Sequence, residues 1–178
     1  MNFEHALVRA FNRFFEEAGV HAVAFRLKQS RFAPQVMDVL VDSRFPEYYL
    51  AVECKSLDAR KAGCLYFRQH FSVASGEHQL DREDRFVQAS GRSGLLAVEL
   101  RWGGGRTKEA HMLPWTAVMD AYRSGQAGLT MEGIVSYPAL GRQAGQYLIS
   151  HELISRLHSI RPPDPQEEIE PDGADADW

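Results

Sequence analysis

The sequence predicts a single α/β domain in which a mixed β-sheet is flanked by helices. Stretches rich in β-branched and aromatic residues alternate with stretches in which apolar residues recur every three or four positions, the pattern of strands interleaved with amphipathic helices. With 178 residues and 44% hydrophobic content, the chain is long enough for one well-filled core and short for two. We therefore expect residues 1–160 to form one domain.

The N-terminal element is expected to be a helix that ends at Gly19, with Glu4 in its first turn. Its apolar residues recur at helical intervals, as Phe3, Ala6, Leu7, Ala10, Phe11, Phe14 and Phe15. Residues 21–27 alternate in character and predict the first strand. Residues 28–33 then form a polar, basic loop with Ser30 near its centre.

Residues 34–55 are expected to form two antiparallel strands joined by a loop at 43–47. A hairpin folded at the middle of this loop places Asp38 opposite Glu53. Because side chains alternate along a strand, Lys55 lies on the same face as Glu53. We expect the other face to be the apolar one, formed by Met37, Val39, Val41, Leu50, Val52 and Cys54.

The opposed acids Asp38 and Glu53 require something that offsets their repulsion. Directly opposed residues on such a ladder have Cβ atoms roughly 4.5–5.5 Å apart, and like charges there are unfavourable. A shared proton, a salt bridge to Lys55 or a hard divalent cation would offset this repulsion. Mg²⁺ typically takes one or two carboxylates and keeps positions for water and phosphate. The alternative is an ordinary hairpin whose solvent face carries these charges without any chemistry.

The segment 59–73 interleaves aromatic and basic side chains. The aromatic residues are Tyr66, Phe67 and Phe71, which follow the aliphatic Leu65, and the basic residues are Arg60, Lys61, Arg68 and His70. Such a mixture is expected on a surface that holds a sugar-phosphate backbone. The alternative is that the aromatic residues belong to the core or to a subunit contact and that the cations form their solvated rim.

After this segment we expect a helix, two strands and further helices. Ser75 as N-cap and Gly91 as stop predict a helix from about Gly76 to Ser90. The strands are expected at 95–100 and 110–113, and the later helices at 115–124 and 152–160. Residues 125–150 contain five glycines and show weak periodicity, so they predict no particular element.

The net charge of −4 is unevenly distributed along the chain. Residues 162–178 hold seven of the 24 acidic side chains and no Lys or Arg, so residues 1–161 carry 17 acidic and 20 basic side chains. Sixteen of these cations are Arg, the side chain best matched to phosphate oxygens. The mildly basic body permits a nucleic-acid partner. We expect the acidic, proline-containing segment 161–178 to be a disordered tail.

Several classes of protein are excluded or unsupported. No stretch reaches the roughly 18 uninterrupted apolar residues of a membrane span, and the first residues do not form a signal peptide, so we expect a cytoplasmic protein without a membrane partner. Cys54 and Cys64 cannot form a disulfide framework and are expected to be reduced thiols. The histidines lack zinc-ligand spacing, no G-x-S-x-G elbow occurs, and residues 103–108 lack P-loop spacing and are expected to connect two strands.

Taken together, these features resemble the PD-(D/E)XK nuclease superfamily. The resemblance is carried by Glu4 on the first helix, Ser30 in a basic loop, Asp38 on one strand, Glu53-Cys54-Lys55 on the next, and Gln79 on the following helix. It covers about residues 3–120, and within the superfamily the chain is most similar to Holliday junction resolvases of the archaeal type, with a fainter likeness to the RecU group. The fold this implies is restriction-endonuclease-like, a mixed sheet flanked by helices.

The resemblance also implies roles for particular residues. Asp38 and Glu53 are the expected metal-binding carboxylates, Lys55 is the expected catalytic lysine, and Glu4 is the expected helix-borne acid that completes the metal or water site. The main-chain carbonyl of Cys54 resembles the further metal ligand of the family. Contacts with DNA are expected from Lys28, Ser30, Arg31, Arg68 and Gln79.

The function implied is Mg²⁺-dependent hydrolysis of DNA phosphodiester bonds, with Mn²⁺ as a substitute. The closest analogy is resolution of four-way (Holliday) junctions in recombination and repair. Because two matched cuts need two active sites related by a two-fold axis, the resemblance also implies a homodimer. Two alternatives stay open: a nuclease of the same fold with another DNA substrate, restriction-like or in repair, and a non-catalytic DNA-binding scaffold that has lost metal binding.

Overall fold

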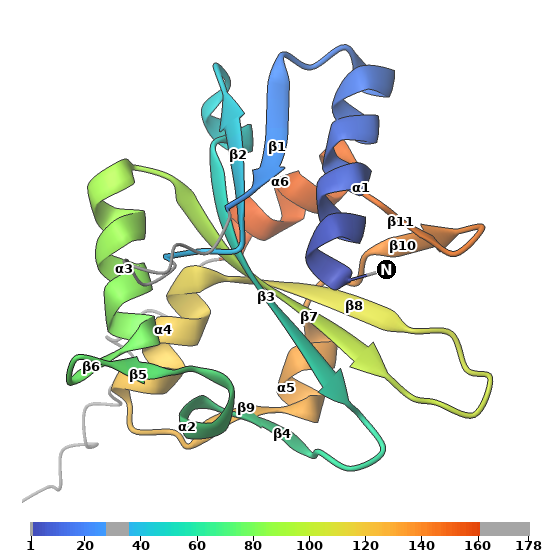
Figure 1. Ribbon diagram of the computed structural model, residues 1–178. Coiled ribbons are helices and arrows are strands. Elements are labelled where there is room, and N and C mark those ends of the chain that lie inside the picture. Colours follow the sequence, from blue (N-terminus) through green and yellow to red (C-terminus); the bar gives the residue numbers. More distant parts are fainter. Residues whose placement is uncertain (1, 28–35, 161–178) are drawn as a thin grey trace, which may run out of the picture.

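The computed structural model describes residues 2–27 and 36–160 (Figure 1). At its centre lies a five-stranded sheet with the strand order β1-β2-β3-β7-β8. The strands are β1 (Ala22–Arg26), β2 (Val39–Ser43), β3 (Leu50–Asp58), β7 (Ser93–Arg101) and β8 (Glu109–Pro114). β3 and β7 run parallel and the other neighbours are antiparallel, so the sheet is mixed, as predicted.

Helices cover both faces of this sheet (Figure 1). α1 (Phe3–Ala18) and α6 (His151–Ser159) pack on one face, while α3 (Gln79–Ser90) and α4 (Trp115–Arg123) pack on the other. The predicted fold class, an α/β domain with a mixed sheet flanked by helices, is therefore confirmed. The first helix also ends where it was expected to end, because Gly19 adopts a left-handed φ of 64° that glycine tolerates without a Cβ clash.

β2 and β3 form the predicted hairpin, joined through the short 3-10 helix η1 (Pro46–Tyr48). The register pairs Val39 with Val52 and ends there, and the backbone N–H of Asp38 donates to the carbonyl oxygen of Val52 at 3.2 Å. The predicted pairing of the two strands is confirmed, while the direct opposition of Asp38 and Glu53 stays a prediction. Both faces of the hairpin are buried. Val39, Val41, Leu50, Val52 and Cys54 lie in the core beneath α1, and Leu40, Ala51 and Leu57 lie in the core beneath α3.

The expectation of one apolar and one polar face is therefore wrong, and Met37 does not lie on the same side as Val39. Met37 belongs with Leu40 to the core beneath α3. The strand begins at Val39 and the chain bends at Asp38, so the alternation of the strand does not extend back to Met37. Since helices cover both faces of the sheet, Glu53 on the central strand is placed in the interior.

The helix α3 begins later than predicted. The segment expected to be its first turn forms the hairpin of β5 (Val73–Ala74) and β6 (Glu77–His78) instead. Ser75 and Gly76 adopt φ values of 53° and 79°, the positive values that a tight two-residue hairpin turn requires. The N-cap is His78, whose Nδ1 accepts a hydrogen bond from the backbone N–H of Leu80 at 3.3 Å.

The remaining elements are short and lie around the main sheet. β4 (Cys64–Tyr66) pairs with β9 (Gly128–Thr130), and β10 (Gly141–Gln143) pairs with β11 (Gln146–Leu148). The short helices are α2 (Phe67–His70) and α5 (Met131–Ser136). These elements account for most of residues 125–150, where none was predicted. The strands expected at 95–100 and 110–113 and the helices expected at 115–124 and 152–160 are confirmed with small shifts of their ends.

Several smaller expectations can be compared with the structure. Cys54 and Cys64 are both free, as predicted, and both are buried. Residues 103–108 connect β7 to β8, also as predicted. Within the described ranges, no helix combines the length and the apolar character needed to cross a membrane. The division between a domain and the tail at 161–178 stays a prediction, because the tail lies outside the described residues.

The pairing of β4 with β9 depends on a glycine at position 128. A Cβ atom on Gly128 would lie 2.3 Å from the carbonyl oxygen of Leu65 and 2.7 Å from the Cα of Tyr66. Because both contacts are with backbone, the clash cannot be relieved by a rotamer change. We expect Gly128→Ala to lower the free energy of unfolding by about 1–3 kcal/mol, measured by urea denaturation.

Gly63→Ala is the matched control, because no heavy atom lies within 4 Å of a Cβ placed there. Its free energy of unfolding should stay within about 1 kcal/mol of the parent value. Equal stability of the two variants would contradict the close backbone approach described here.

Candidate active site

The candidate site is centred on β3, which lies between β2 and β7 in the main sheet. Glu53 is buried there, with only 3% of its surface exposed. Lys55 follows two residues later on the same face, and its Nζ donates a hydrogen bond to Glu53 Oε1 at 2.6 Å. The same Nζ lies 4.4 Å from the ring centroid of Phe71. The lysine is thus held between a buried carboxylate and an aromatic face.

Asp38 reaches the same strand from the bend that precedes β2. Its Oδ2 accepts a hydrogen bond from the backbone N–H of Cys54 at 2.9 Å. This bond ties the aspartate to β3 beside Glu53. The charge of Asp38 is one of the causes that raise the pKa of Glu53, as expected for two neighbouring acids.

The pKa of the Cys54 thiol is affected by the charged side chains around it. Burial is the largest cause that raises the pKa of this thiol well above its ordinary value. The charged groups that also act on it are Asp38, Glu53, Glu4 and Lys55, of which the lysine alone lowers the pKa. Asp38, Glu53, Glu4 and Lys55 therefore lie near enough to act on a thiol of β3, and their catalytic roles stay predictions.

Glu4 enters the group from the first turn of α1. Its Oε2 lies 3.6 Å from Nη2 of Arg26 on β1. The same oxygen is buried and has no hydrogen-bond partner within residues 2–27 and 36–160. The charge of Arg26 offsets part of the cost of burying this oxygen, which still lacks a hydrogen-bond donor.

The helix α3, which packs on one face of the sheet, contributes two side chains to the site, Gln79 and Glu83. Gln79 Nε2 donates to Glu53 Oε1 at 2.8 Å and to Glu83 Oε1 at 2.7 Å. The amide oxygen of Gln79 accepts from the backbone N–H of Ser72 at 3.0 Å. The predicted residue Gln79 is thus used to hold two acids in place, and its contact with DNA stays a prediction.

Sequence reasoning missed Glu83, which is fully buried. The available signal was its spacing, four residues after Gln79 and on the same helical face as the buried residues Leu80 and Val87. An acid at a core position of an amphipathic helix needs a partner, and the partner here is the Glu53 group.

Glu53 and Glu83 form a buried acid pair that is linked through the Gln79 amide. Burial is the largest cause that raises the pKa of Glu53 to about 7, and the positive charge of Lys55 opposes it. Burial and then the charge of Glu53 raise the pKa of Glu83 well above its ordinary value. The salt bridge to Lys55 therefore offsets part of the repulsion that the sequence predicted between Asp38 and Glu53.

The donor set fits a hard divalent cation. No cluster of three His, Cys, Asp or Glu groups suited to holding a metal occurs in the described part of the chain. Mg²⁺ does not need three, because it takes one or two carboxylates and retains waters. Asp38 and Glu53 offer such oxygens, and Glu4 Oε2 and Glu83 Oε2 are buried nearby without a hydrogen-bond partner among the described residues. The ligand role of the Cys54 main-chain carbonyl stays a prediction.

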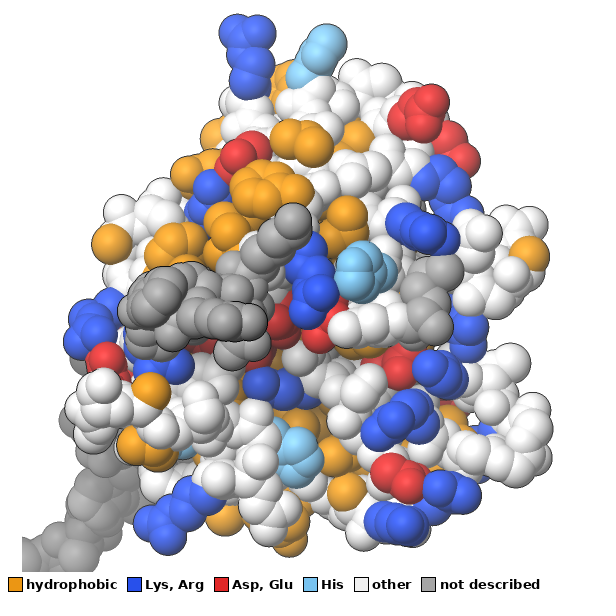
Figure 2. Space-filling view, viewed as in Figure 1, with side chains coloured by type: hydrophobic (Ala, Val, Ile, Leu, Met, Phe, Trp, Pro, Cys, Tyr) orange, Lys and Arg blue, Asp and Glu red, His pale blue; other side chains and the backbone are white. Residues whose placement is uncertain are grey.

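Only some of the residues predicted to contact DNA lie within the described part of the chain. Lys28, Ser30 and Arg31 lie outside the described residues. Arg68 is exposed on α2. Figure 2 shows acidic side chains at the middle of this face of the molecule, with Lys and Arg side chains around them.

Both interpretations of the segment 59–73 hold for part of it. Leu65, Phe67 and Phe71 are buried, as the core alternative predicted. Tyr66 and Arg68 are exposed, as the surface interpretation requires. The segment therefore supplies both packing and an accessible aromatic and basic surface.

The raised pKa values predict how stability depends on pH. Between the ordinary pKa of 4.5 and the value of about 7 for Glu53, the folded protein keeps a proton that the unfolded chain has released. The free energy of unfolding therefore falls as the pH rises through this window. Glu83→Gln removes one buried acid while keeping its shape. We expect its loss of stability between about pH 5 and about pH 8, measured without divalent metal, to be smaller than that of the parent by on the order of 1–2 kcal/mol.

Glu132→Gln, at an exposed position of α5, is the matched control and should follow the parent pH profile. Parallel profiles for all three proteins would show that the buried glutamates do not titrate as described.

Comparisons with known proteins give a likeness to solved structures alone. No protein-family model matches the chain, and no curated protein matches it. Among solved structures, the chain is similar to the 1.6 Å structure of Archaeoglobus fulgidus Hjc, a Holliday junction resolvase from an archaeal hyperthermophile. The sequence identity is 15% and the TM-score is 0.41, with 87% of this chain and 89% of that chain covered. At these values the likeness assigns no activity, and the chemistry must be argued from the site itself.

Proposed function

We propose that the protein is a metal-dependent endodeoxyribonuclease whose active site is formed by Asp38, Glu53 and Lys55. The observation that carries this proposal is the meeting of two carboxylates and an ammonium on the central hairpin, with Lys55 Nζ 2.6 Å from Glu53 Oε1. Hard oxygen donors beside a lysine are suited to phosphoryl chemistry, in which catalysis consists mainly of positioning and of neutralising charge.

Asp38 and Glu53 would hold a Mg²⁺ ion, with the main-chain carbonyl of Cys54 and with Glu4 as further oxygen donors. When bound, the cation supplies Lewis-acid polarisation of a phosphoryl oxygen and acidifies water. Gln79 and Glu83 would act as positioning residues, because the Gln79 amide links both glutamates.

The reaction is hydrolysis of a phosphodiester bond. The oxygen of water adds to phosphorus, the bond from phosphorus to the leaving sugar oxygen breaks, and that oxygen takes up a proton. Lys55 carries a compact point charge that can neutralise the negative charge developing on the phosphoryl oxygens or orient the attacking water. Its place against Phe71 limits the directions in which the ammonium can move.

The preference for branched DNA is a finer part of this proposal. It rests on the resemblance of the sequence motifs to archaeal-type resolvases, which implies four-way junctions as substrate, a role in recombination and repair, and a homodimer with two active sites. The mildly basic residues 1–161, with their 16 arginines, suit a phosphate-rich partner. The free thiols Cys54 and Cys64 suit a cytoplasmic protein.

Asp38→Asn tests the assignment of the site. The substitution removes a carboxylate charge and keeps the shape that accepts the Cys54 N–H. We expect Mg²⁺-dependent cleavage of labelled DNA to fall by roughly 10²-fold or more, while DNA binding stays close to that of the parent. Asp120→Asn, at an exposed position of α4, is the control and should cleave like the parent. Unchanged turnover in Asp38→Asn would refute the assignment.

A panel of four-way, flap and linear duplex substrates tests the substrate. Paired cuts in the four-way junction, with little cleavage of linear duplex, are expected for a resolvase. Equal cleavage of linear duplex would replace the junction proposal with a nuclease of another specificity. No heat of Mn²⁺ binding to the intact protein, together with no cleavage of any substrate, would favour the DNA-binding scaffold.

A further inference from the structure

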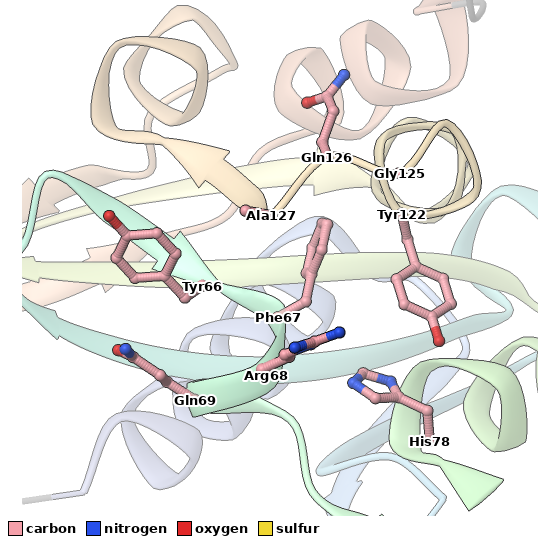
Figure 3. A pocket seen from close by; sticks show the side chains of 9 residues that line it. All are labelled: Tyr66, Phe67, Arg68, Gln69, His78, Tyr122, Gly125, Gln126 and Ala127. Carbon is pink, nitrogen blue, oxygen red and sulfur yellow. The ribbon is translucent and has the colours of Figure 1, made fainter.

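A second cavity lies beside the candidate active site, between α2, the start of α3 and the end of α4 (Figure 3). It has a volume of about 630 Å³, within the range of small-molecule sites. The side chains that shape it are those of Tyr66, Phe67, Arg68, Gln69, His78 and Tyr122, and the segment Gly125–Ala127 closes its edge.

The walls of this cavity are aromatic. The rings of His78 and Tyr122 are stacked, with centroids 5.0 Å apart and planes inclined by 24°. Phe67 meets Tyr122 edge-on at 5.6 Å and forms a buried part of the wall. Figure 3 shows Tyr66 on the opposite side of Phe67 from Tyr122. Tyr66 is 43% exposed, so a large aromatic surface remains open to a planar ligand.

The polar groups around these rings suit a nucleobase. Arg68, Gln69 and Gln126 are exposed and line the cavity, and no carboxylate is among the lining residues. The amides offer both donors and acceptors to the edge of a base, and the guanidinium can stack on a base or bind phosphate. His78 Nε2 is buried at this wall without a hydrogen-bond partner in the described part of the chain.

Aromatic contacts connect the cavity to the candidate active site. The ring of Phe71 lies 4.4 Å from Lys55 Nζ on one side, and its centroid lies 6.4 Å from that of His78 on the other. His78 directly precedes Gln79, which holds Glu53. Two successive contacts therefore separate the lysine from the cavity wall. A strand with a phosphate at Lys55 would have a nearby base within reach of this wall.

We propose that the cavity binds an unpaired nucleobase of the DNA strand that enters the active site, an inference that rests on the proposed nuclease function. A base within a duplex is stacked on both faces and cannot enter a pocket without leaving the stack, at a cost in unstacking and unpairing. An already unpaired base avoids this cost and stacks on the exposed ring of Tyr66. The substrate class is thus DNA whose nucleotides beside the cleaved bond are unpaired, or become unpaired at a branch point when the protein binds.

The test compares two labelled oligonucleotides that differ only in their bases. Binding of a single strand and of the same strand with abasic sites is measured by fluorescence anisotropy, with the intact protein in EDTA so that no cleavage occurs. Since both strands carry the same phosphates, a difference reports on the bases alone. We expect the parent protein to bind the base-bearing strand about 10-fold tighter.

Tyr66→Ala should abolish this difference, and Tyr66→Phe should keep it, because the ring rather than the hydroxyl provides the stacking surface. Phe45→Ala is the matched control, since Phe45 is also 43% exposed but lies at the start of η1 in the β2–β3 connection. It should bind both strands like the parent. Circular dichroism shows whether each variant is folded.

Equal affinity of the parent for the two strands would overturn the proposal, and so would a folded Tyr66→Ala variant that keeps the preference. The outcome is independent of cleavage. A protein that cuts DNA but shows no preference for bases would overturn the pocket alone. A preference for bases in a protein that cuts no DNA with Mg²⁺ would overturn the nuclease function and leave the pocket in place.

Discussion

The burial of Glu53 is the constraint on which the arrangement of the site depends. A carboxylate on the central strand of a sheet covered on both faces loses its hydration, and this loss must be offset by protons, cations or hydrogen bonds. Each neighbour supplies one of these. Lys55 and Gln79 donate to the same oxygen of Glu53, and the Gln79 amide also donates to Glu83. The site is therefore one network, because the removal of any member leaves a buried charge or acceptor without its partner.

This network also ties together segments that are distant in the sequence. Gln79 is the first residue of α3, and its amide contacts both glutamates and the backbone of Ser72. His78, one residue earlier, caps the helix and forms part of the wall of the aromatic cavity. The hairpin of β5 and β6 thus sets the start of α3, the position of Gln79 and the shape of the cavity together. A change in this hairpin would therefore alter both the candidate active site and the aromatic cavity.

Sequence reasoning was reliable where the signal is local and periodic. The spacing of the phenylalanines in α1 and the stop at Gly19 predicted that helix, and the loop length predicted the pairing of β2 with β3 that brings Asp38 to β3. Sequence reasoning failed where the tertiary structure decides the conformation or the burial of a residue. Ser75 has the chemistry of an N-cap, yet the turn requires it at positive φ, and Glu83 appears as a solvated acid until the sheet is placed beneath α3. Whether both faces of a strand are covered cannot be inferred from that strand alone.

The cost of the buried acids bears on what the site is for. Apolar residues of similar volume would fill the space around Glu53 and Glu83 without losing hydration, and such replacements of buried charges are often neutral or stabilising. The acids are therefore not explained by the stability of the fold. A cation coordinated by their oxygens, and a phosphate bound by Lys55, would offset the cost of burying these charges. Such a conflict between function and stability is common at functional sites. The same reasoning applies to Tyr66. Its ring is exposed to water in the folded protein, and a planar partner that covers the ring would remove this apolar surface from water.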